Sequence, residues 1–135
     1  MHAVGGEGSI LVYGNFEKTR LTALRSSYPD IEAELNALVN RLVDLCGIVT
    51  NNVYHPQFRG SFSIKAVLPA LVPDLSYAGL AVADGDKAIT RFARIARGEI
   101  AGVAVAETRD QLLEYCKLDT LGMVRLHEVT SDMVK

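Results

Sequence analysis

Short apolar runs and amphipathic stretches alternate along the chain. The run Ser9–Tyr13 is apolar and β-favouring, and glycines bound it on both sides, so it predicts a buried strand. Asn15 can cap the segment that follows, which predicts a helix over Phe16–Arg25. The first eight residues are Gly-rich, and we expect them to form a flexible N-terminus.

The pattern then changes to that of a longer amphipathic helix beginning at Asp30, which can cap the free N–H groups of a first turn. Apolar residues follow at i, i+4, i+7, i+8 and i+11, one face of a helix: Ile31, Leu35, Leu38, Val39 and Leu42. The segment 42–45 either ends this helix or begins a short strand. The segment 48–58 contains Asn51-Asn52 and His55-Pro56 and is predicted to be a loop.

Two helices are predicted in the middle of the chain. Ser61 or Ser63 can cap the first, Ile64–Leu71, in which Pro69 should cause a kink or an early end, because proline removes a helical hydrogen bond. The second follows a connector over 73–83, begins at Asp84 or Asp86 and stops at Gly98. Its inward residues are predicted to be Ile89, Phe92 and Ile95.

The last helix is predicted to open at a capping box formed by Thr108 and Gln111 and to run to about Val129. Together, these elements predict a helix-rich α/β chain with one or two strands. A buried strand normally needs neighbours in a sheet, and the sequence offers few of them.

Composition narrows the class of protein. The chain has 135 residues, a length that predicts one domain with its own core. Of these residues, 49% are hydrophobic and 22% are charged, and the net charge is −2. This composition excludes a disordered chain. Cys46 and Cys116 are too few for a disulfide scaffold. The longest apolar run, 100–106, is far shorter than the about 20 residues of a membrane span, and no signal peptide is visible. We therefore expect a cytoplasmic protein with no membrane contact.

Tyr115 and Asp119 are the first candidates for chemistry. Residues at i and i+4 share a helix face, so both side chains should lie together. An acid on an inward face is costly unless it is paired or bound to a metal. The alternative is that Asp119 pairs with an arginine or caps a loop, and that Tyr115 belongs to the core.

Glu17 is the second candidate, because it comes shortly after the first predicted strand, where α/β proteins place active sites. Its carboxylate could bind Mg²⁺ or Mn²⁺. The alternative is that Glu17 only complements the dipole of the helix that starts there.

Basic side chains form the third candidate. The helix after Asp84 carries four of them at helical spacing: Lys87, Arg91, Arg94 and Arg97. They could bind a phosphate backbone, as could Lys65. The alternative is a solvated face, and the mildly acidic net charge argues against a purely electrostatic nucleic-acid binder.

The three motifs, in this order, resemble the later two-thirds of a DEDD-type 3′–5′ exonuclease domain with an RNase H-like fold. They are Leu11-Val12-Tyr13-Gly14-Asn15-Phe16-Glu17, then Ser63-Ile64-Lys65, then Tyr115-Cys116-Lys117-Leu118-Asp119. A closer resemblance is to domain of unknown function family 2779, across the segments 16–21, 60–71 and 115–120. The resemblance extends from Ser9 over nearly the whole chain, so the domain is expected over 9–135.

The resemblance implies specific roles. Glu17 would take the second-motif acid position and Asp119 would bind the metal, Mg²⁺ or Mn²⁺. Tyr115 would orient the attacking water, and Asp44 matches a frequently acidic position of less certain role. In such enzymes two ions activate a water and stabilise the leaving oxygen of a phosphodiester.

One motif departs from this pattern. The Asp-x-Glu of the first strand is missing upstream of Ser9, and Asp30-Ile31-Glu32 comes too late in the order. The resemblance therefore implies an incomplete RNase H-like fold, a piece of a longer protein, and weak or no activity of the isolated chain on single-stranded nucleic acid ends. The alternative is a non-catalytic binding or assembly module that dimerises or docks on a larger nuclease, covering an open sheet edge.

Overall fold

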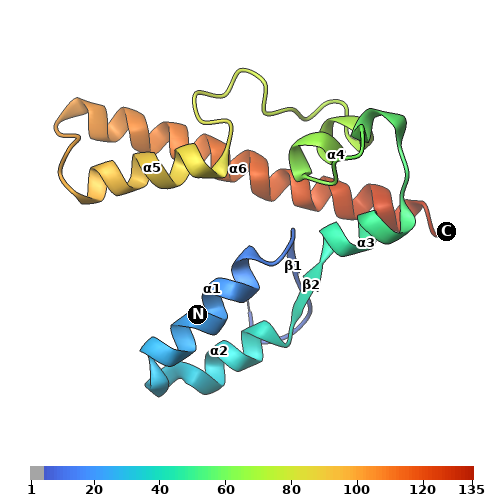
Figure 1. The fold of residues 1–135 in the computed structure, drawn as a ribbon, viewed down its shortest axis with the longest axis horizontal. Coiled ribbons are helices and arrows are strands. Elements are labelled where there is room, and N and C mark those ends of the chain that lie inside the picture. The colour runs from blue at the N-terminus through green and yellow to red at the C-terminus, as the bar shows by residue number, and fades with distance from the viewer. Residues whose placement is uncertain (1–4) are drawn as a thin grey trace. The chain divides into compact units, whose positions relative to one another are not determined.

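The computed structural model describes residues 5–135, and the chain divides into two compact units, Met1–Val67 and Leu68–Lys135. The elements of the first unit are β1 (Ile10–Val12), α1 (Phe16–Ser27), η2 (Pro29–Ile31), α2 (Glu32–Val39), β2 (Leu42–Asp44), α3 (Leu45–Asn52) and η3 (Pro56–Phe58). Helix α4 (Ile64–Leu71) crosses the boundary, and α5 (Gly85–Ala96) and α6 (Val103–Asp132) complete the second unit (Figure 1). The helix-rich α/β composition agrees with the prediction.

The first unit is built around a two-stranded parallel sheet. Ile10 pairs with Leu42 and Val12 pairs with Asp44, so both strands end at the same edge. Parallel strands need a crossover connection, and here α1 and α2, which pack against each other, provide it. Val12 at the end of β1 is buried.

Arg41, just before β2, holds part of the Gly-rich N-terminal segment. Its guanidinium donates to the carbonyl oxygens of Gly8 at 2.7 Å, Glu7 at 2.7 Å and Gly5 at 3.0 Å. The flexible terminus was expected over residues 1–8, of which residues 1–4 lie outside the described part. The described remainder has no regular secondary structure, but it is tied to β2 by these hydrogen bonds.

The structure decides one alternative in the first unit and corrects one prediction. The segment 42–44 forms β2, the short strand that was one of the two alternatives for it, so Leu42 lies outside the helix. The predicted loop over 48–58 is wrong for 48–52, which belongs to α3. Asp44 starts this helix by accepting the backbone N–H of Cys46, and the side-chain amides of Asn51 and Asn52 donate to carbonyls one turn back instead of forming a turn.

The second unit has a core to which α4, the connector 72–84 and α6 contribute. Leu68, Val72, Val82 and Leu126 are almost fully buried. Gly122 of α6 is also buried, and a Cβ atom there would lie 2.8 Å from Leu68 Cδ2. The missing side chain at this position therefore allows Leu68 to approach the α6 backbone.

Helix α4 has the predicted bounds and continues through Pro69, which lies in its last turn. There the proline removes one intrahelical hydrogen bond shortly before the helix ends. Helix α5 starts as predicted, with Asp84 as its N-cap, and Gly98 follows its end in the left-handed region, at φ 72°.

The predicted inward face of α5 is wrong in part. Ile89 and Phe92 are 57% and 66% exposed. Ile95 is partly buried, as predicted, and the other partly buried residues on this side are Ala88 and Arg91. Arg91 reaches across to Gln111 of α6. Figure 1 shows α5 running alongside the N-terminal part of α6.

The predicted capping box of the last helix is also wrong. Helix α6 begins at Val103, after Gly102 with φ 61°, and Thr108 lies inside it. The alanine-rich start of α6 has sufficient helix propensity to continue upstream of Thr108. Among the helices of residues 5–135, none is both long enough and apolar enough to cross a bilayer.

Candidate functional site

The two acids expected to bind metal lie in different units. Glu17 is exposed in the first turn of α1, where its charge complements the free N–H groups of the helix. Asp119 is on α6 in the second unit. Over residues 5–135, no group of three or more His, Cys, Asp or Glu side chains is arranged to hold a metal ion.

Asp44 stands at the carboxyl end of β2 and connects three parts of the first unit. Its Oδ1 accepts the backbone N–H of Gly14 at 2.7 Å and that of Cys46 at 2.9 Å. One carboxylate oxygen thus caps α3 and fixes the chain where it leaves β1. The arrangement makes Asp44 a structural acceptor whose removal leaves two N–H groups without their partner.

Tyr13, at the end of β1, was not singled out as a site residue by the sequence. Its hydroxyl donates to the carbonyl oxygen of Phe62 at 2.8 Å, and Cys46 Sγ lies 3.7 Å from the same oxygen. Burial, and then the neighbouring Cys46, raise the pKa of the Tyr13 phenol well above its usual value. The phenol therefore stays neutral and serves as a hydrogen-bond donor.

Tyr115 and Asp119 lie on the packed face of α6, as their spacing predicts. The hydroxyl of Tyr77, from the connector, donates to Asp119 Oδ1 at 2.5 Å, and Tyr77 is 7% exposed. The rings of Tyr77 and Tyr115 are 6.1 Å apart and tilted by 45°. Burial, and then the charge of Asp119, raise the pKa of Tyr115 to about 12.

The sequence anticipated an arginine or a loop cap as the alternative partner of Asp119, and the structure supplies a tyrosine. Tyr77 lies 42 residues upstream, in a segment without periodicity, so no local signal marks it as the partner. The Asp119 carboxylate links the connector to α6, because its Oδ1 accepts a short charge-assisted hydrogen bond from Tyr77.

The basic side chains of α5 each have a partner within the second unit. Lys87 pairs with Asp84 at 3.2 Å, and Arg94 and Arg97 both pair with Glu99, at 3.5 and 2.6 Å. Arg91 donates to the side chain of Gln111 and to a backbone carbonyl. Two carboxylates, Asp84 and Glu99, thus pair with three of the four cations, and Arg91 keeps its charge because its partners are uncharged. Lys65 is exposed near the start of α4.

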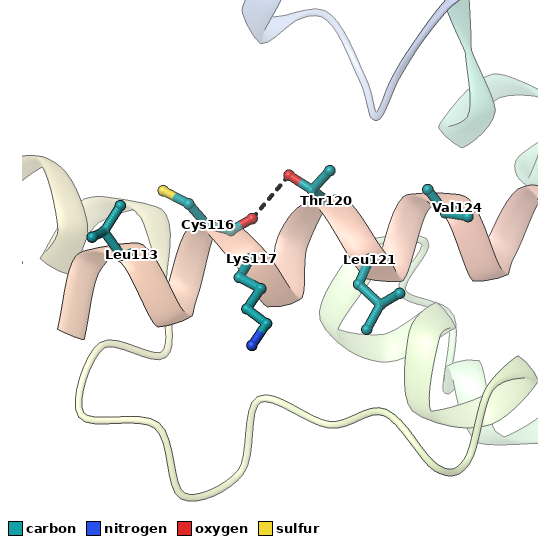
Figure 2. Close-up of a pocket in the computed structure, with 6 residues that line it drawn as sticks. All are labelled: Leu113, Cys116, Lys117, Thr120, Leu121 and Val124. Carbon is teal, nitrogen blue, oxygen red and sulfur yellow. Dashed lines mark hydrogen bonds between the residues drawn. The ribbon is translucent and has the colours of Figure 1, made fainter. Parts of the chain in front are cut away.

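A different surface emerges on the side of α6 opposite its packed face. We call it the outer face of α6, and it consists of Leu113, Cys116, Lys117, Thr120, Leu121 and Val124. These residues recur at helical spacing and line a shallow hollow of about 530 Å³. Figure 2 shows all six on α6, with the Thr120 hydroxyl hydrogen-bonded to the Cys116 carbonyl oxygen at 2.9 Å.

The apolar members of the outer face are accessible. Leu113 is 50% exposed, Leu121 is 42% exposed and Val124 is 49% exposed. The packed face, on the other side of the helix, contains Gly122 and Leu126, which are buried. Periodicity in the sequence predicts one inward face for this helix, so the outer face was not predicted.

Residues 1–63 match a family model described as Domain of unknown function (DUF2779). The matched segment lies within the first unit and ends before Leu68. It includes Glu17 and Asp44, and leaves out the segment around Tyr115 and Asp119 on which part of the resemblance rested. No curated protein and no solved structure matches the chain.

Proposed function

We propose that this chain is a non-catalytic docking module of a nuclease-related protein, rather than a metal-dependent exonuclease in its own right. The observation that carries the proposal is the outer face of α6, an apolar helix surface left open while the opposite surface of the same helix is packed. A helix that is apolar on two opposite sides is usually buried on both. Exposed apolar patches of this kind mark interaction sites.

The candidate catalytic residues support the same conclusion. A hard metal ion binds through carboxylate oxygens. Asp119 already accepts the hydroxyl of the nearly buried Tyr77, and Asp44 already accepts two backbone N–H groups. In each acid, Oδ1 is engaged in hydrogen bonds that hold its own unit together, which fits a structural role.

The charges favour a protein partner over nucleic acid. Lys87, Arg94 and Arg97 are paired with acids of their own unit, which weakens the attraction that a phosphate backbone needs. The outer face carries one cation among apolar side chains, a composition suited to the core and rim of a protein interface.

The catalytic part of the proposal is tested with a nuclease assay on the full chain. A 5′-labelled single-stranded DNA and the corresponding RNA are incubated with Mn²⁺ or Mg²⁺ and either the wild-type chain or Asp119→Asn. We expect no shortening from the 3′ end by either protein. Shortening by the wild type that is lost in the variant would overturn the proposal.

The docking part is tested with the thiol of Cys116, which lies on the outer face and is exposed. A leucine-rich amphipathic helical peptide with an uncharged apolar face is added, and iodoacetamide labelling of Cys116 is followed by mass spectrometry. Cys46, half-buried in the first unit, is the internal reference.

We expect the peptide to slow labelling of Cys116 but not of Cys46. Leu121→Asp should abolish this protection. Phe92→Asp is the matched control, because Phe92 is an exposed apolar residue on α5 and not part of the outer face. Equal protection in both variants, or none in the wild type, argues against docking on this face.

A further inference from the structure

We infer that the partner of α6 is a second copy of this chain, packed antiparallel along the helix so that its Glu128 faces Lys117. The inference rests on the proposed docking function and names the partner of that surface. It follows from the spacing, the exposure and the order of charges along one row of residues on α6.

This row, which we call the seam, runs along most of the length of α6. It consists of Asp110, Glu114, Lys117, Leu121, Val124, Glu128, Ser131 and, just beyond the end of the helix, Lys135. Successive members are alternately four and three residues apart, which is the heptad spacing of helices that pack side by side. Lys117, Leu121 and Val124 also belong to the outer face. Figure 2 shows Lys117 and Leu121 one turn apart and pointing the same way.

The seam is accessible along its whole length. Seven of its eight members are exposed, and Ser131 is partly buried. The buried residues of α6, Gly122 and Leu126, do not belong to it. A second helix can therefore lie along the seam without displacing the side of α6 that packs on its own unit.

The order of charges makes the seam complementary to itself. Its spacing is symmetric about the midpoint between residues 122 and 123, so in an antiparallel pair with a two-fold axis there, each member faces another member. The facing pairs are Asp110 with Lys135, Lys117 with Glu128, Glu114 with Ser131, and Leu121 with Val124. Opposite charges thus meet on both sides of an apolar centre, and each pair occurs twice.

The ion pairs already present along the seam do not prevent this arrangement. Glu128 pairs with Arg125 at 3.1 Å and Lys135 pairs with Asp132 at 2.7 Å, all with exposed side chains. Ion pairs of this kind contribute little in water, so Glu128 and Lys135 lose little by turning to the second copy. None of the ion pairs among residues 5–135 includes Lys117.

Other arrangements of two copies match fewer charges. A parallel pair in register places every charge of the seam against its like, which is unfavourable. An antiparallel pair in which Asp110 faces Lys117 makes one kind of ion pair instead of two, and leaves Glu128 outside the overlap of the helices. The charges therefore favour the register in which Lys117 faces Glu128.

The test is sedimentation equilibrium of the full chain, in which we expect the wild type to form a dimer that weakens with added salt. Lys117→Glu should raise the dimer dissociation constant about tenfold or more, because like charges then face each other twice. Glu128→Lys should act in the same way. The double variant exchanges the two charges, and its dissociation constant should return to within about threefold of the wild type.

Lys18→Glu is the matched control, because it changes the net charge equally at an exposed lysine of α1. It should leave the dimer unchanged, and circular dichroism checks that every variant folds. Equal weakening by Lys18→Glu and Lys117→Glu would overturn the inference, because net charge alone would then explain the effect. A double variant that stays as weak as the single variants would also overturn it.

The outcomes separate this inference from the proposed function. A monomeric wild type whose Cys116 is protected by the leucine-rich peptide would overturn the inference and leave docking intact. A monomeric wild type whose Cys116 is not protected would overturn both proposals.

Discussion

Substitution of Gly122 by alanine tests the packing of α4 on α6. Gly122 is buried in the middle of α6, and an added Cβ would lie 2.8 Å from Leu68 Cδ2 and 3.4 Å from Leu68 Cδ1. Leu68 is fully buried, so its side chain cannot turn towards solvent to make room. The substitution therefore sets a steric cost against the higher helix propensity of alanine.

The two effects differ in size. Alanine in place of glycine inside a helix stabilises by about 1 kcal/mol. Forcing a methyl group into a packed core costs about 1–3 kcal/mol. We therefore expect Gly122→Ala to lower the free energy of unfolding by about 1 kcal/mol. In a Leu68→Ala background the clash is removed, and the same substitution should raise that free energy by about 1 kcal/mol.

Urea denaturation of the four proteins measures these values, with circular dichroism as the probe. The change of sign between the two backgrounds is the decisive feature, because helix propensity alone acts equally in both. If Gly122→Ala stabilises the wild type as much as it stabilises Leu68→Ala, the close contact between Leu68 and the α6 backbone is refuted.

Three further predictions concern polar groups. Asp44→Ala should lower the free energy of unfolding by about 1–2 kcal/mol, because it removes a helix cap. Asp44→Asn keeps a hydrogen-bond acceptor, so the same denaturation experiment should show a smaller decrease. Tyr77→Phe should lower the free energy of unfolding by about 2 kcal/mol, because it removes a hydrogen bond to the charged Asp119. An unchanged free energy of unfolding in Tyr77→Phe would show that this hydrogen bond does not stabilise the fold. The folded pKa of Tyr115 is raised to about 12 from an ordinary value of 10.0, so the folded state binds more protons there and stability should fall as pH rises from 10 to 12. Tyrosinate absorbance at 295 nm should show a phenol titrating near pH 12 that disappears in Tyr115→Phe, and its persistence would contradict the assignment.

Local signals in the sequence predicted several elements well. Apolar runs bounded by glycine located β1, and the cap at Asp84 with Gly98 beyond the end located α5. Spacing alone brought Tyr115 and Asp119 to one face. These features depend on residues close together in the chain, where capping and periodicity decide the structure.

The remaining features depend on partners distant in sequence. Tyr77 hydrogen-bonds to Asp119, and Tyr13 hydrogen-bonds to the Phe62 carbonyl oxygen. No periodic pattern in the intervening sequence indicates these partners. Helix α5 leaves Ile89 and Phe92 exposed, while Arg91 hydrogen-bonds to Gln111 of α6. Helical periodicity gives the faces of a helix, but it does not show which face the rest of the chain covers.

The most direct test of the central claim, that Asp119 serves the structure of the second unit and not a metal site, is thermal unfolding of the wild type and Asp119→Asn with and without Mn²⁺. An ion bound at about 10 µM affinity would stabilise the folded chain by about 2.7 kcal/mol at about 1 mM. We expect no Mn²⁺-dependent shift in either protein, and a lower unfolding temperature for Asp119→Asn in both conditions. A Mn²⁺-induced rise in the wild type that is absent from Asp119→Asn would contradict the account.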